Sequence, residues 1–137
     1  MTPTRGERNN NPGNIDRNQI KWQGMAEDQS SDARFVVFGT PEDGIRALAK
    51  VLLSYRRKLG LRTVRQIINR WAPPVENDSG AYIRHVADSV GVDADDPIDV
   101  EDAGVLEPLV RAIIAHENGR IVYDDAIIVA AVDRALA

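Results

Sequence analysis

One carboxylate in the sequence stands where an apolar residue is expected. Apolar side chains recur at helical spacing over 106–117, and at about 100° per residue Glu117 falls in the middle of their stripe. It also lies in the last helical turn, where the dipole disfavours negative charge. Both surroundings favour the neutral carboxyl, the form that a glycosidase needs in its general acid. We predict this role for Glu117; the alternative is a frayed helix end that exposes it to water.

Cleavage of a glycosidic bond often uses a second carboxylate, as the base that activates water or as the nucleophile. The candidates are Glu76, Glu42 and Glu7. Each also has a purely structural explanation. Glu42 lies where the positive end of a helix dipole favours an acid, Glu76 precedes a helix start, and Glu7 fits an exposed ion pair. A lytic transglycosylase would need Glu117 alone, first as acid and then as base.

An asparagine-rich segment over 5–15 suits the binding of sugars. Asparagine side chains both donate and accept hydrogen bonds, as the hydroxyl and N-acetyl groups of a glycan require. The alternative is a solvated turn in which asparagine tolerates unusual backbone angles. We expect Asn10 and Asn14 to line a substrate cleft, together with Tyr82 and with Trp22, whose ring would stack on a sugar face.

Metal and cofactor chemistry finds no support in the sequence. There is no cysteine, and the two histidines, His85 and His116, belong to no His-Glu-x-x-His motif. His116 lies near a helix C-terminus, where it would interact with the last carbonyl groups. We therefore expect no metal site and no cofactor.

Charge is divided unevenly along the chain, whose formal net charge is −4. Residues 1–70 hold 13 Lys and Arg against 7 Asp and Glu, whereas residues 71–137 hold 4 against 14. An acidic total argues against a nucleic-acid partner, although the basic half would attract an anionic polymer such as a bacterial cell wall. We predict a cleft between the two halves, near Trp71, with Glu117 in acidic surroundings.

Length and composition predict one globular domain over 1–137. The 137 residues are 43% hydrophobic and 28% charged, which excludes disordered and fibrous classes. Residues 1–34 form a polar N-terminal arm without the apolar run of a secretory signal peptide. No apolar run approaches the length of about 20 residues that a membrane span needs.

Helical signals predict a mainly α fold with a short β-hairpin. Thr40 and Pro41 form a strong helix start and Gly60 a stop. Trp71 ends an apolar helical stripe, which favours a place in the core. Residues 35–38 are β-prone and bounded by glycine, as in a strand; Pro108 is tolerable only in the first turn of its helix. The predicted helices cover about 41–58, 64–71, 78–90, 106–117 and 125–136.

Four ordered motifs resemble a family of small phage and prophage proteins. They are Arg5-Gly-x-Arg-Asn-Asn-Asn-Pro-Gly-Asn-Ile15, Phe35-x-x-Phe-x-Thr-Pro-Glu-Asp-Gly-Ile-Arg-Ala-Leu48, Ile68-Asn-Arg-Trp-Ala-Pro-Pro-x-Glu-Asn-Asp78 and Ala112-Ile-Ile-x-His-Glu-Asn-Gly119. Members of that family are identified as virion structural proteins or as lysozyme-like peptidoglycan hydrolases. The resemblance implies bacterial peptidoglycan and other virion proteins as partners. It also implies a location in the virion, or in the host cytoplasm before release to the periplasm.

A second resemblance concerns mechanism. Cell-wall glucosaminidases and lytic transglycosylases place a catalytic glutamate at a helix end, followed by an asparagine-rich segment and a hairpin with phenylalanine. Residues 10–15 and 35–38 are similar to that downstream part, but the similar helix, Ala112–Gly119, follows them here. The resemblance implies a circularly permuted lysozyme-like domain with Glu117 as general acid. The rival interpretation is a non-catalytic virion structural or cell-wall-binding protein on the same fold.

Overall fold

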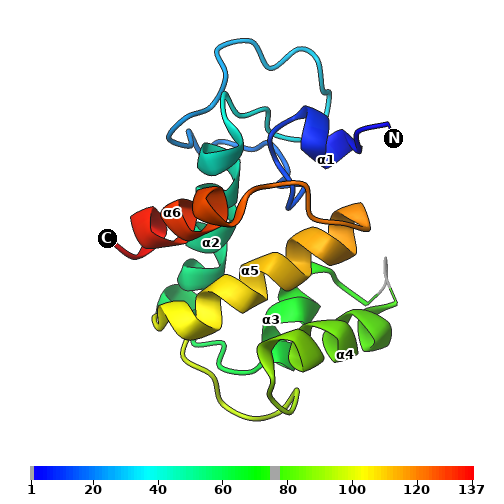
Figure 1. Cartoon of the computed structure of the whole chain (residues 1–137), viewed down its shortest axis with the longest axis vertical. Coiled ribbons are helices and arrows are strands. Elements are labelled where there is room, and N and C mark those ends of the chain that lie inside the picture. Colours follow the sequence, from blue (N-terminus) through cyan, green and yellow to red (C-terminus); the bar gives the residue numbers. More distant parts are fainter. Residues whose placement is uncertain (1, 75–77) are drawn as a thin grey trace.

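Helices dominate the computed structural model, which describes residues 2–74 and 78–137 (Figure 1). The mainly α class is therefore confirmed. The helices that it describes are α1 (Arg5–Arg8), α2 (Pro41–Leu59), α3 (Val64–Trp71), α4 (Ser79–Val90), α5 (Ala103–Asn118) and α6 (Asp125–Leu136).

The predicted start and stop signals define most helix ends. The Thr40 side chain accepts a hydrogen bond from the Asp43 N–H, and Pro41 opens α2. Gly60, at the other end, adopts the left-handed conformation that a helix stop requires. Gly91 and Gly119 end α4 and α5 in the same way. The bounds of α2, α3, α4 and α6 thus agree with the sequence to within one residue.

Helix α5 begins three residues earlier than predicted. The Asp102 side chain accepts a hydrogen bond from the Gly104 N–H at 2.8 Å, which caps the helix there. The sequence predicted Pro108 in the first turn of this helix. Because α5 begins earlier, Pro108 lies beyond the first turn. Its missing N–H costs one intrahelical hydrogen bond, and the buried apolar face of α5 offsets that loss.

The N-terminal arm differs from the sequence prediction in two respects. It contains the short helix α1, whose start is a capping box between Thr4 and Glu7. The strand predicted over 35–38 is reduced, among the described residues, to two isolated antiparallel bridges, Asp16 with Phe35 and Met25 with Phe38. Asparagine side chains take the place of a longer ladder, since Asn11 Nδ2 donates to two backbone carbonyls of this region.

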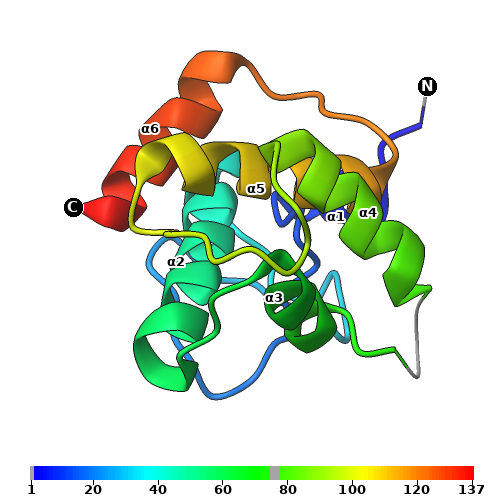
Figure 2. The ribbon, with the colours of Figure 1, turned by 90° about the horizontal axis from the view of Figure 1, so that it is seen from below.

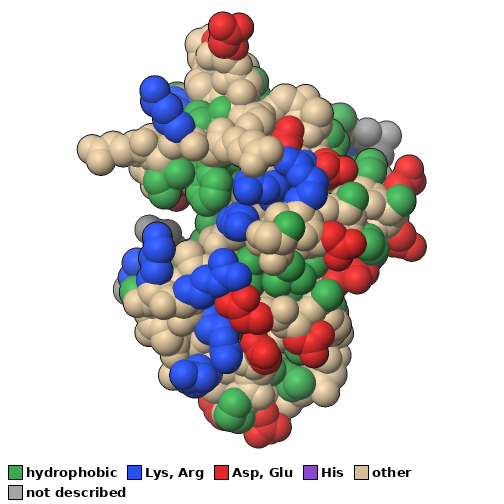
Figure 3. Space-filling model, turned by 90° about the vertical axis from the view of Figure 1, so that its left-hand side faces the viewer, with side chains coloured by type: hydrophobic (Ala, Val, Ile, Leu, Met, Phe, Trp, Pro, Cys, Tyr) green, Lys and Arg blue, Asp and Glu red, His purple; other side chains and the backbone are tan. Residues whose placement is uncertain are grey.

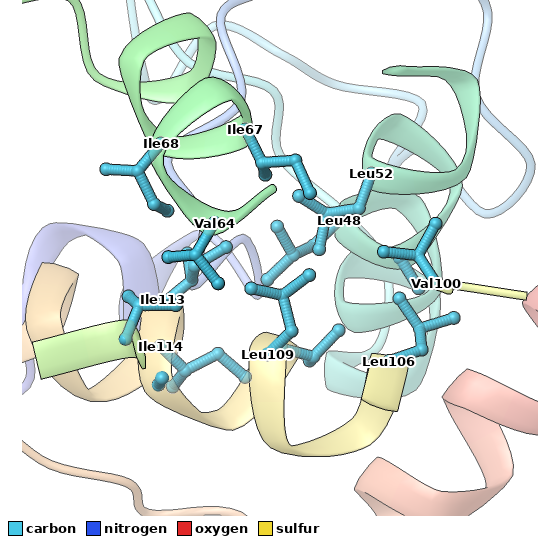
Figure 4. Close-up of a cluster of buried hydrophobic side chains, with 14 of the residues drawn as sticks. Leu48, Leu52, Val64, Ile67, Ile68, Val100, Leu106, Leu109, Ile113 and Ile114 are labelled. Carbon is cyan, nitrogen blue, oxygen red and sulfur yellow. The ribbon is translucent and has the colours of Figure 1, made fainter. Parts of the chain in front are cut away.

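The arm and the pair α3–α4 lie at opposite ends of the molecule, with α2 and α5 between them (Figures 1 and 2). Helix α6 packs along α2, and α4 packs on α5. Aliphatic side chains from α2, α3 and α5 meet in the core (Figure 4). A smaller cluster of Ile15, Val36, Phe38 and Ala47 holds the arm on α2. Across the part of the chain that is described, no helix is both long and apolar enough to traverse a membrane.

Candidate functional site

A cleft of about 1080 Å³ separates the arm from one face of α2. Figure 3 shows this hollow, with hydrophobic side chains above it and Lys and Arg side chains below. The α2 residues that line it are spaced at i, i+1, i+4, i+5, i+7 and i+8, so they form a single helical face. They are Lys50, Val51, Ser54, Tyr55, Arg57 and Lys58.

Glu117 reaches the cleft from the last turn of α5. Its neighbour Asn118 fixes this turn against the arm: the Asn118 Nδ2 donates to the Pro12 carbonyl at 2.8 Å. The Asn118 Oδ1 in turn accepts from the Thr4 hydroxyl at 2.7 Å. The end of α5 and the arm are therefore locked together, although more than 100 residues separate them in sequence.

The structure brings three predicted site residues into contact. Tyr82 donates its hydroxyl hydrogen to Glu117 Oε2 at 2.9 Å. Asn14 Nδ2 lies 3.4 Å from Glu117 Oε1, a long and therefore weak hydrogen bond. Asn14 Oδ1 is buried with no partner among the described residues. One carboxylate oxygen is thus firmly held and the other only loosely.

Tyr82 is itself firmly placed. Its side chain is buried and its ring stacks on His116, with centroids 3.7 Å apart and planes 21° apart. Burial, and next the charge of Glu117, raise the pKa of Tyr82 well above its ordinary value. The hydroxyl therefore stays protonated and can act only as a donor toward the carboxylate at any ordinary pH.

Both tryptophans of the chain line the cleft. The indole N–H of Trp22 is buried without a hydrogen-bond partner in the described part of the chain. Trp71 was predicted for the core, and it does pack on both core clusters. A Cβ on Gly13 would lie 3.1 Å from its ring. The helical spacing predicted its burial but not its exposed edge.

Two of the predicted second carboxylates lie away from the cleft. Glu7 accepts hydrogen bonds from Arg120, with Nε to Oε2 at 3.0 Å, and these bonds lower the pKa of Glu7. Glu42 is bound by Arg134, which ties α2 to α6. Both carboxylates form ion pairs, and that of Glu7 is largely buried rather than exposed as its alternative had it. Glu76 falls outside the described residues.

The asparagine-rich segment is mostly structural. Asn10 does not line the cleft; its Nδ2 donates to the Phe38 carbonyl at 3.0 Å, and its φ of 51° is one that asparagine tolerates better than most residues. Asn9 is buried and donates to Asp32 at 2.8 Å. Asn14 is the asparagine of this segment that lines the cleft, between Gly13 and Ile15. Asn9 and Asn11 are buried and hydrogen-bonded, so they differ from the solvated turn that was the alternative; the unusual backbone angle that it implied is found at Asn10 and Asn14.

The charge around Glu117 corrects the sequence prediction. The cleft does not divide the two halves of the chain, because most of its described lining comes from residues 13–70, and Glu117 is the one charged residue there that belongs to the acidic half. Asp16, which sequence reasoning missed, is the other carboxylate in the described lining, and it pairs with Arg34 at 2.7 Å. The surroundings are cationic: Arg34, Lys50, Arg57, Lys58 and Arg70 line the same cleft.

The two histidines meet outside the cleft, with their Nδ1 atoms 3.3 Å apart. Partial burial and the neighbouring His85 lower the pKa of His116. Among the described residues, no group of three or more His, Asp or Glu side chains is arranged to hold a metal ion.

Comparison with known proteins places the chain among phage proteins. No protein-family model matches it. Over 118 residues it is 40% identical to Protein P5 of Pseudoalteromonas phage PM2, an alignment that covers 84% of this chain and 71% of the relative. The chain therefore belongs to the same family as this phage protein.

Proposed function

We propose that this protein is a phage glycosidase that cuts the β-1,4 glycan of bacterial peptidoglycan. The observation that carries the proposal is Glu117 at a helix end in a large cleft, held by Tyr82 and approached by Asn14. Membership in a phage protein family supports a bacterial wall as the target. The enzyme would be a muramidase, a glucosaminidase or a lytic transglycosylase, carried by the virion or released to the periplasm as an endolysin.

In the proposed reaction Glu117 protonates the glycosidic oxygen as that bond breaks. The Tyr82 hydroxyl holds Oε2, so the carboxyl group has a fixed orientation. Displacing the long Asn14 contact would free Oε1 to face the bond. Trp22 and Trp71 offer ring faces to sugar units along the cleft.

The second step has two routes. Asp16 could activate a water molecule or attack the sugar, since it is the other carboxylate that lines the described cleft. A lytic transglycosylase would instead use Glu117 again, now as base. Asp16→Asn separates these routes: loss of activity supports the hydrolytic route, and retained activity with anhydro products supports the transglycosylase route.

We propose a circularly permuted lysozyme-like arrangement for the domain. In the unpermuted arrangement the catalytic helix precedes the asparagine-rich segment and hairpin, whereas here α5 follows them in sequence. The contacts of Asn118 with Thr4 and Pro12 nevertheless set the end of α5 directly beside the arm. The two isolated bridges lie where the hairpin would stand.

Clearing of purified cell walls tests the proposal. The wild-type protein should reduce the turbidity of a wall suspension and release soluble muropeptides. Glu117→Gln should lose at least about 100-fold in rate, as removal of a general acid does. Glu107→Gln is the matched control on the same helix, because Glu107 pairs with Arg111 and does not line the cleft. Clearing by Glu117→Gln at the wild-type rate would overturn the assignment.

A non-catalytic virion or wall-binding component is the second candidate. It is favoured by the pairing of Asp16 with Arg34, which occupies the other cleft carboxylate. Wild-type protein that pellets with walls but releases no muropeptides would support this candidate over the enzyme.

A further inference from the structure

The charge of the cleft is opposite to the charge of the chain. Among the described residues, five cationic side chains and two carboxylates line it, while the chain as a whole carries a formal charge of −4. Figure 3 shows the Lys and Arg side chains gathered along one side of the hollow. A concave wall of one sign concentrates the electric field and attracts ligands of the opposite sign.

Two of these cations are held by carboxylates. Arg57 makes a two-pronged pair with Glu101, both contacts at 2.7 Å, and Arg34 pairs with Asp16. Lys50 and Lys58 form no ion pair within the described residues. Arg70, the fifth cation of the lining, forms none either, so a bound anion could pair with it and with the two lysines without displacing a carboxylate; the two lysines lie together on α2.

Lys50 and Lys58 are eight residues apart on the face of α2 that lines the cleft. At about 1.5 Å per residue they are separated by roughly 12 Å along the helix axis. Val51, Ser54 and Tyr55 lie on this face with them. The face therefore presents a positive charge at each end and hydrogen-bonding and apolar side chains between them.

We infer that Lys50 and Lys58 make the cleft selective for glycans whose substituents carry carboxylates, as peptidoglycan does on its peptide stems. A neutral β-1,4 glycan such as chitin has the same backbone but nothing to pair with these lysines. The inference rests on the proposed function, and it names the feature that distinguishes peptidoglycan from a neutral glycan as the substrate. Single-stranded nucleic acid, which also favours basic grooves with aromatic rings, is disfavoured here by Glu117 and Asp16 in the lining.

Tryptophan fluorescence measures the binding directly, because both tryptophans of the chain line the cleft. Glu117→Gln, which prevents cleavage, is titrated with a muropeptide tetrasaccharide and with chitotetraose at low salt. The muropeptide should bind about tenfold more tightly, a few-fold from each exposed charge pair. That difference should fade at 0.5 M salt, where screening is strong.

Adding Lys50→Gln and Lys58→Gln should remove most of the preference for the muropeptide while leaving chitotetraose binding unchanged. Arg62→Gln is the matched control, since it removes one exposed positive charge outside the cleft. Circular dichroism of each variant verifies that it folds. Equal affinity for the two glycans, or equal weakening of both by the lysine changes, would overturn the inference.

The two proposals fail differently. Cleavage of peptidoglycan and chitotetraose at equal rates would agree with the proposed glycosidase activity but contradict the proposed selectivity for glycans that carry carboxylates. Selective binding of the muropeptide without cleavage by the wild-type protein would contradict the glycosidase alone. Binding of an oligothymidylate more tightly than the muropeptide would assign the basic face to nucleic acid and overturn the inference.

Discussion

Residue by residue, the site depends on partners that fix the orientation of Glu117. The side chain has a protonated hydroxyl on one oxygen and an amide near the other. Tyr82 in turn is held between the His116 ring and the core. The Tyr82 hydroxyl thus positions the proposed acid rather than reacting itself.

Tyr82→Phe tests this positioning. The ring keeps its packing, so the free energy of unfolding should fall by only about 1 kcal/mol, the ordinary loss of one hydrogen bond. The rate of muropeptide release should fall about 10- to 100-fold, since the carboxyl group is no longer oriented. Tyr123→Phe is the control, because its hydroxyl has no partner among the described residues. Release of muropeptides by Tyr82→Phe at the wild-type rate would contradict the positioning role.

Asp32 is the structural centre of the arm. Its buried carboxylate accepts hydrogen bonds from Arg5 at 2.7 and 2.8 Å, from Asn9 at 2.8 Å and from the Phe35 N–H at 2.8 Å. The Arg5 guanidinium above all, and next the backbone N–H of Phe35, hold the pKa of Asp32 well below its ordinary value of 3.8.

Asp32→Asn should consequently destabilise the protein in a pH-dependent way. The folded-state pKa is lowered, so the stabilisation is complete above the unfolded value near 4 and is lost as the pH falls further. Urea midpoints should therefore differ between wild type and variant at pH 7 and converge as the solution becomes more acidic than pH 4. A difference in midpoint that grows on acidification would contradict this account.

The sequence identified part of the site for reasons that the structure explains. Helical spacing alone marked Glu117, because an acid in an apolar stripe needs no tertiary information to stand out. Helical spacing could not exclude Glu7 and Glu42 as candidates for the second carboxylate. Their partners, Arg120 and Arg134, are more than 90 residues distant and come close only through the fold.

At the scale of elements, the close approach of α2 to the arm decides the shape of the cleft. A Cβ placed on Gly44 would lie far inside the contact distance of the Asn10 carbonyl oxygen, which is backbone and cannot rotate away. Only glycine lets the first turn of α2 come this close to the arm.

Gly44→Ala should therefore lower the free energy of unfolding by about 1–3 kcal/mol or more, as overpacking does. Gly80→Ala is the control, since its Cβ would meet only ordinary contacts at 3.5 Å or beyond. That helical substitution should be neutral or slightly stabilising. Denaturant unfolding measures both variants, and equal midpoints for the two would contradict the proposed close approach.

Helix bounds were more predictable than irregular structure. Caps such as Thr40 and Gly60 act through neighbouring backbone groups, so local sequence suffices to find them. The arm was harder to predict because Asn11 and Asp32 satisfy backbone groups of distant segments. Such long-range side-chain bonds replaced the predicted strand by isolated bridges.

For the whole molecule, the division of charge along the chain has a different meaning from the one predicted. The basic half does not face the acidic half across a cleft; it folds around the cleft and supplies nearly all of its lining. The sequence shows the segregation of charge, but only the fold turns the arm and α2 toward each other. Glu117 is the one charged residue that the acidic half contributes to the described lining.

Mass spectrometry of the material released from purified peptidoglycan tests the central claim most directly. The account predicts soluble muropeptides with intact peptide stems and a broken glycosidic bond, ending in a reducing or an anhydro sugar. Glu117→Gln should release none of them. Cleaved peptide stems on uncut glycan strands, or the same glycan fragments from Glu117→Gln as from the wild type, would contradict the account.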